Sequence, residues 1–166
     1  NSIAQIAPEF TMNRMLRDYI DRFYSKEAKR SKLLVADNYK KAKEIAAWKQ
    51  EVVAKWDSIE IKSVNLPEAI LYSPHVGEEY PIEVAIDPKG LGNCIGVELV
   101  VTPVEDGQMK PYQVYELNVI KATSDSTVFH IDYQLRAAGT YKYSFRMYPK
   151  NPDLPHRQDF AYVRWF

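Results

Sequence analysis

The sequence predicts a mainly β protein, an immunoglobulin-like antiparallel β-sandwich preceded by two α-helices. Up to Trp56 the apolar residues recur with helical spacing, and after it they alternate with polar residues. About seven short alternating runs then follow in roughly 105 residues, separated by turn-forming stretches such as Asp87-Pro88-Lys89-Gly90. This combination is typical of a sandwich whose strands have one buried and one solvated face.

The first helix is predicted over residues 11–24. The Thr11 hydroxyl can cap its first turn. Apolar residues at helical spacing form one wide stripe along it, made of Met12, Met15, Leu16, Tyr19, Ile20 and Phe23. Because a stripe this rich is unstable in water, we expect another surface to cover it, either a further part of a larger chain or a second copy binding through residues 12–23.

A basic stretch and a second helix follow. Lys26, Lys29, Arg30 and Lys32 are interpreted as a solvated charged linker, the alternative being a phosphate or nucleic-acid patch. The second helix is predicted from about Asp37 to Trp56. One of its faces carries Ile45, Trp48, Val52 and Trp56, which favours core packing over stacking on sugar rings.

The strands are predicted from period-two alternation. Their apolar positions are Ile59 and Ile61; Ile82, Val84 and Ile86; Ile95, Val97, Leu99 and Val101; Tyr115, Leu117 and Val119; Phe129, Ile131, Tyr133 and Leu135; and Tyr141, Tyr143, Phe145 and Met147. A last strand is predicted from Phe160 to Phe166, with Val163 and the indole of Trp165 buried and Arg164 on the opposite face.

Composition limits the class of protein. The formal net charge is zero, which argues against nucleic acid as a partner. The N-terminus has no signal-like segment, and no run approaches the ~20 apolar residues of a membrane span, so we expect a cytoplasmic protein without a membrane partner. The chain also lacks an initiator methionine, which favours a fragment of a longer protein.

A search for catalytic or metal-binding groups finds no candidate. His75, His130 and His156 lack metal-ligand spacing, and the single Cys94 rules out an intramolecular disulfide. No catalytic, cofactor-binding or metal-binding residue is therefore predicted. Tyrosine is enriched, and sugar-stacking roles are considered for the three whose placement is least certain, Tyr112, Tyr148 and Tyr162.

Three stretches resemble a known family. The segment Ala7–Tyr19 (APEFTMNRMLRDY) resembles the closing helices of the α-glucan phosphorylase catalytic region. The segment Ala46–Trp56 (AAWKQEVVAKW) fits the same family, and the tail Asn151–Trp165 (NPDLPHRQDFAYVRW) looks like the C-terminus of the shorter bacterial members. The chain is thus similar to the C-terminal segment of a bacterial glycogen or starch phosphorylase.

The resemblance implies a division at residue 57. Residues 1–57 would be the end of a glycosyltransferase-B catalytic region with a connector helix, docked on the catalytic body, and residues 58–166 an accessory sandwich. The family moves glucose between α-1,4-glucan and phosphate with pyridoxal phosphate, whose lysine is expected upstream. Two other hypotheses remain, a starch- or glycogen-binding module and a protein-interaction sandwich; an exposed row of aromatic residues on one sheet would favour the first of these two.

Overall fold

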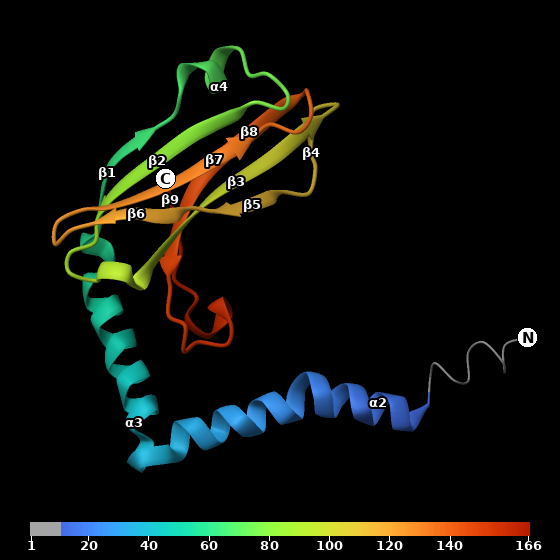
Figure 1. The fold of residues 1–166 in the computed structure, drawn as a ribbon, viewed down its shortest axis with the longest axis vertical. Helices are drawn as coiled ribbons and strands as arrows, with labels where there is room; N and C mark the ends of the chain where they lie inside the picture. The colour runs from blue at the N-terminus through green and yellow to red at the C-terminus, as the bar shows by residue number, and fades with distance from the viewer. Residues whose placement is uncertain (1–10) are drawn as a thin grey trace, which may run out of the picture. The chain divides into compact units, whose positions relative to one another are not determined.

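The computed structural model describes residues 11–166 (Figure 1). These residues divide into two compact units, with the division between Trp48 and Lys49. The beginning of the family-like stretch, Ala7–Phe10, lies outside the described residues. None of the described helices is both long enough and apolar enough to cross a membrane.

The first unit is helical. Helix α2 (Met12–Tyr19) begins at Thr11, whose Oγ1 accepts a hydrogen bond from the Arg14 amide at 3.3 Å, as predicted. A π-helical turn, η1 (Ile20–Tyr24), continues into α3 (Ser25–Lys55). No residue of α2 is buried, and the apolar stripe remains about half exposed, from 45% at Tyr19 to 65% at Met12.

The predicted charged linker is wrong, because Lys26, Lys29, Arg30 and Lys32 lie within α3. Neither glycine nor proline interrupts residues 25–35, and most of these residues favour helix. The break comes later, where Ala36 is extended and Asp37, Asn38 and Tyr39 have positive φ. Aspartate and asparagine tolerate that conformation better than most residues. The second helical stretch therefore resumes after Tyr39, rather than starting at Asp37 as predicted.

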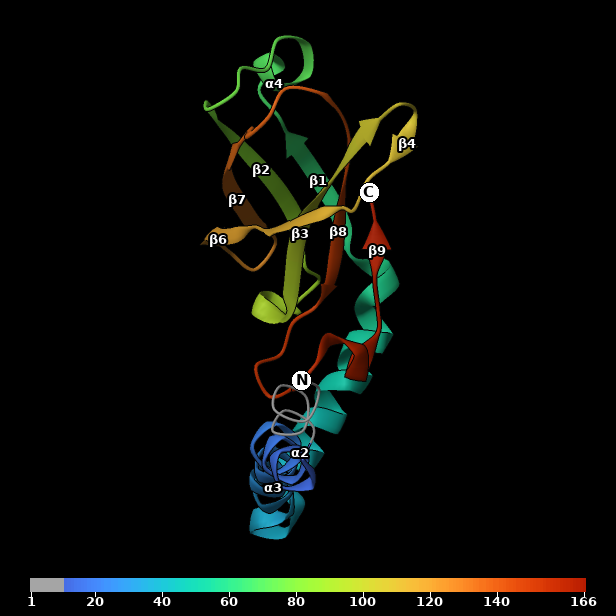
Figure 2. The same ribbon diagram turned by 90° about the vertical axis from the view of Figure 1, so that its right-hand side faces the viewer.

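The second unit begins with the end of α3 and the 3₁₀ turn η2 (Trp56–Ser58). Two antiparallel sheets follow. The first sheet has the order β1 (Glu60–Asn65), β2 (Glu79–Asp87), β7 (Thr127–Gln134), β6 (Asn118–Ala122). In the second sheet, β3 (Ile95–Glu105) pairs with β5 (Gln113–Glu116) and β4 (Gln108–Met109) and with β8 (Thr140–Pro149), which pairs with β9 (Arg164–Trp165). Figure 2 shows β3, β8 and β9 side by side.

The core lies between the sheets and confirms a mainly β sandwich preceded by helices. Short helical segments lie at the ends of the strands: α4 (Glu68–Tyr72), η3 (Gly92–Cys94) and η4 (Arg157–Phe160). Most of the predicted inward positions are buried, with Ile82, Val84, Ile86, Val97, Leu99, Phe129 and Met147 all at most 1% exposed. Val52 near the end of α3 and Trp56 in η2, which were predicted to share one face, are both buried.

One predicted strand is divided between the two sheets. Residues 113–116 form β5 in the second sheet, and residues 118–122 form β6 in the first. Leu117 lies at the crossing, where it is buried and its amide donates to the Val97 carbonyl at 2.9 Å. Tyr115, Leu117 and Val119 therefore do not share one face, because the chain changes sheet between them.

The predicted tail strand is largely wrong. Phe160 belongs to η4, and only Arg164 and Trp165 form β9, opposite Met147 and Arg146. The orientation is also the reverse of the prediction: Trp165 is 53% exposed, whereas Arg164 is partly buried and donates to the Ile59 carbonyl at 2.5 Å. Tyr143, predicted to be in the core, is 49% exposed, because β9 pairs only with Arg146 and Met147 and the beginning of β8 lies at the sheet edge.

Candidate functional site

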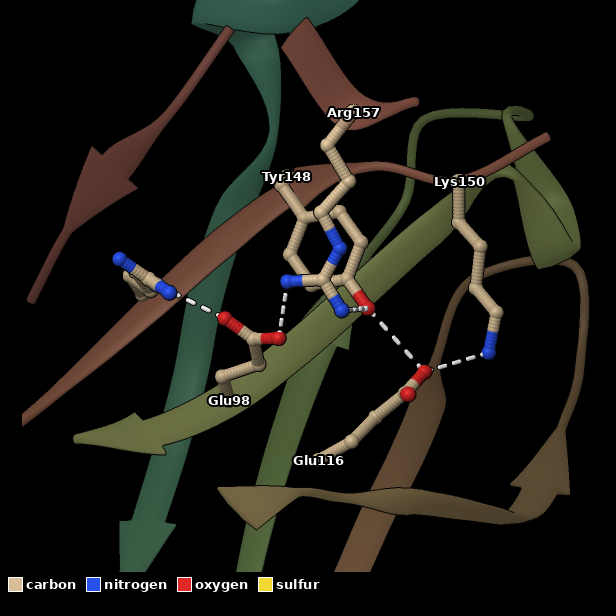
Figure 3. A network of polar contacts seen from close by, with 6 residues as sticks. Glu98, Glu116, Tyr148, Lys150 and Arg157 are labelled. Carbon is tan, nitrogen blue, oxygen red and sulfur yellow. Dashed lines mark hydrogen bonds and ion pairs between the residues drawn. The ribbon is translucent and has the colours of Figure 1, made fainter. Parts of the chain in front are cut away.

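The outer face of the second sheet carries a network of connected polar contacts (Figure 3). Its centre is Glu98, in a stretch of β3 whose residues 95–101 are all buried. A strand buried on both faces needs a cover on its outer side. The segment 150–163 supplies part of that cover, since Arg157 reaches Glu98 and several residues of this segment line a hollow with it.

Strand register assembles the network. Glu98 lies opposite Glu116 on β5 and opposite Arg146 on β8, and Arg146 lies opposite Trp165 on β9. Paired residues in antiparallel strands project from the same face, so these four side chains form one row across the sheet. Two carboxylates side by side repel each other, so the row requires cations to stabilise it.

The cations come from three positions. Arg146 Nε donates to Glu98 Oε2 at 2.8 Å, and the guanidinium of Arg157 pairs with Glu98 Oε1. Lys150 Nζ lies 2.5 Å from Glu116 Oε1. Only 2% of the Glu98 side chain is exposed, and both of its carboxylate oxygens have a cationic partner. These charges are satisfied within the chain, so the network acts as an anchor for the segment 150–163.

Tyr148 connects the two carboxylates. Its hydroxyl donates to Glu116 Oε1 at 3.0 Å and accepts from Arg157 Nη2 at 3.1 Å, and the Arg157 guanidinium lies 4.0 Å from the ring centroid. The ring is 5% exposed and lies over Gly96, the residue opposite it on β3. A Cβ at position 96 would lie 2.4 Å from Tyr148 Cζ, so only glycine allows this approach.

The environment changes the acidity of the network. The hydrogen bond from Lys150 lowers the pKa of Glu116, against the opposing effect of burial. Burial raises the pKa of Tyr148, and it raises the pKa of the core residue Tyr133 to about 12. Neither phenol is therefore suited to act as a base near neutral pH.

We expect these two phenols to ionise late in an alkaline titration. Their neutral forms contribute stability that is complete below the unfolded pKa of about 10 and is lost as pH rises toward the higher folded values. Part of the tyrosinate absorbance of the native chain, the late fraction, should thus appear only above the ordinary tyrosine pKa. Tyr148→Phe and Tyr133→Phe should each reduce this late fraction. In denaturant the late fraction should disappear. A native titration identical to the denatured one would contradict this expectation.

The three tyrosines considered for sugar stacking lie in different surroundings. Tyr148 is buried under Arg157, as described above. Tyr162 is 36% exposed, and its ring packs edge-on against Trp56 with the two ring centroids 5.9 Å apart. Tyr112 is 62% exposed and lines a separate hollow on the outer face of the second sheet. Their sugar-stacking role stays a prediction.

Sequence reasoning missed the anchoring network. The signal was present, because Glu98 is the single charge within the apolar run 95–101, and an uninterrupted apolar run indicates a strand covered on both faces. Among residues 11–166, no cluster of three or more His, Cys, Asp or Glu side chains could hold a metal ion.

Comparison with known proteins identifies the family. The model of the glycogen phosphorylase C-terminal domain matches residues 56–166, two thirds of the chain. The chain belongs to this family. The matched region begins at Trp56 and contains both sheets and every member of the anchoring network.

Relatives extend the similarity over the helices. A maltodextrin phosphorylase of Thermococcus litoralis is 28% identical over 99% of this chain, and a glycogen phosphorylase of Mycobacterium bovis is 24% identical over 98%. A glycogen phosphorylase of Mycobacterium tuberculosis is also 24% identical over 98%. The chain spans only 19% of the length of each relative. No solved structure matches it.

Proposed function

We propose that this chain is the non-catalytic C-terminal part of an α-glucan phosphorylase, whose full chain transfers glucose between α-1,4-glucan and phosphate in the cytoplasm. The observation that carries the proposal is the asymmetric coverage, 99% of this chain against 19% of the maltodextrin phosphorylase. The proposed division is a helical segment, residues 1–57, and an accessory sandwich, residues 58–166.

Pyridoxal phosphate is assigned to the upstream catalytic region. This cofactor is held through a lysine amine, and burial is what adjusts such an amine for Schiff-base chemistry. No lysine within residues 11–166 is buried, and Lys150, the lysine of the anchoring network, is ion-paired and 55% exposed. The described residues therefore do not fit a pyridoxal phosphate site.

The helices are proposed to dock on the catalytic body through the apolar stripe of α2 and η1. Met12, Leu16, Tyr19 and Phe23 are each 45–65% exposed, and the Tyr19 and Phe23 rings lie 5.9 Å apart. A contiguous exposed apolar patch of this kind marks an interaction surface. Self-association through residues 12–23 is the competing use of the same stripe.

The sandwich is proposed to be of the immunoglobulin type. Its first sheet has the order β1-β2-β7-β6, which corresponds to strands A, B, E and D of that fold, and β3, β8 and β9 correspond to C, F and G. An accessory role agrees with the anchoring network, because its charged side chains pair with one another rather than facing a substrate.

The test compares the 166-residue chain with a full-length phosphorylase that carries it. With phosphate, maltodextrin and added pyridoxal phosphate, the isolated chain should release no glucose 1-phosphate, whereas the full-length protein should. Replacing Leu16 and Phe23 by aspartate should lower activity or stability of the full-length protein, and Tyr72→Ala on α4 serves as the control.

Phosphorolysis by the isolated chain would overturn the non-catalytic role. Docking through α2 would be refuted if the double aspartate variant matched the unchanged full-length protein in activity and melting temperature. Light scattering of the isolated chain distinguishes docking from self-association. Self-association through residues 12–23 predicts a dimer that dissociates in the double aspartate variant.

A further inference from the structure

The outer face of the second sheet carries a second feature beside the anchoring network. Two aromatic side chains on this face, Tyr112 and Trp165, are 62% and 53% exposed. Both line one hollow of about 310 Å³, in the lower part of the ~300–1,000 Å³ range of small-molecule sites. We name this hollow the aromatic hollow.

Strand pairing places these two rings along the same face of the sheet. Trp165 is placed by β9 pairing with β8, where it lies opposite Arg146, and the Arg146 guanidinium lies 5.3 Å from the indole centroid. This contact holds the ring while leaving half of the side chain accessible. Tyr112 precedes β5 on the other side of β3. The hollow therefore spans the width of the sheet.

Polar groups lie between the rings. The hollow is also lined by Thr102, Lys142, Ser144 and Arg146, with Val100 as the buried apolar residue among them. The Ser144 hydroxyl donates to the Phe166 carbonyl at 3.2 Å, which leaves its oxygen able to accept. Lys142 has no ion-pair partner among residues 11–166 and supplies free donors.

We propose that the aromatic hollow binds an α-1,4-glucan chain, with sugar rings stacked on Trp165 and Tyr112 and sugar hydroxyls bonded to the polar side chains between them. A sugar has apolar ring faces bordered by hydroxyls, and the hollow is lined by two aromatic rings together with hydrogen-bond donors and acceptors. The choice of an α-1,4-glucan rests on the proposed function, and the site would hold the polymer away from the catalytic region.

The experiment uses the 166-residue chain in native gels cast with soluble starch, beside gels with hydroxyethyl cellulose. Starch should retard the unchanged chain and cellulose should not. Trp165→Ala and Tyr112→Ala should each raise the apparent dissociation constant roughly tenfold, whereas Tyr72→Ala, which removes an 81% exposed tyrosine on α4, should leave it unchanged. Because Trp165 is exposed, its replacement should barely change the melting temperature.

Other outcomes overturn the proposal. The site does not exist if starch fails to retard the unchanged chain, and it lies elsewhere if both variants are retarded normally. Equal retardation by starch and cellulose would refute the preference for α-1,4 linkages. If the two variants weaken only the activity of a full-length phosphorylase and not starch binding, the hollow contacts the catalytic body instead. Phosphorolysis by the unchanged full-length protein and its absence from the isolated chain test the proposed function separately.

Discussion

Replacing Glu98 by glutamine should destabilise the sandwich by about 3 kcal/mol, at the lower end of the range for breaking a buried ion pair. The amide keeps the shape of the carboxylate but leaves the Arg146 and Arg157 guanidinium groups without their anion. Arg146 is 21% exposed and cannot fully recover hydration, whereas Arg157, at 53%, can turn toward solvent. The expected fall in melting temperature is roughly 10 °C.

The matched control is Glu116→Gln on the neighbouring strand. Its partner Lys150 is 55% exposed and Glu116 itself is 40% exposed, so this variant should lose less than ~1 kcal/mol. Limited proteolysis gives a second measurement, because Glu98→Gln should release the segment 150–163 and make it more susceptible to cleavage. If Glu98→Gln melts within a degree or two of Glu116→Gln and resists protease equally, Glu98 does not anchor the segment.

Replacing Gly96 by alanine should cost roughly 2–3 kcal/mol, a large effect for the addition of one methyl group. The new Cβ would lie 2.4 Å from Tyr148 Cζ and 2.6 Å from its hydroxyl oxygen. The ring cannot move away freely, because Arg157 lies over it and its hydroxyl bonds to Glu116. The strain therefore passes from β3 into the anchoring network. Chemical denaturation of the variant beside the unchanged chain measures the cost.

A double-mutant cycle with Tyr148→Ala tests this mechanism. Removing the ring costs stability by itself, but it also clears the space above Gly96. In that background, Gly96→Ala should change the free energy of unfolding by less than ~0.5 kcal/mol, which gives a coupling close to the whole single-mutant cost. An equal cost of Gly96→Ala in both backgrounds would place the strain in the backbone of β3 and contradict the steric explanation.

Part of the candidate site was visible in the sequence, and part was not. Tyr112 was selected from the sequence, and it lines the aromatic hollow. Trp165 was assigned to the core instead, and Tyr143 was grouped with Phe145 and Met147 on one apolar face. Alternation records which residues share a face of a strand, but it does not record where the partner sheet or the partner strand ends. Tyr143 follows the alternation and is nonetheless exposed, because its position on β8 lies at an edge.

The sequence by itself determined the mainly β class, the helices before it and most of the core, because the period of the apolar residues follows directly from backbone geometry. Tertiary structure alone decided which strands are neighbours, and thus the row that brings Glu116, Glu98, Arg146 and Trp165 together. It also decided that Leu117 marks a crossing between sheets and that Arg164, not Trp165, faces inward. Such choices depend on contacts between residues up to about a hundred positions apart, which no local pattern encodes.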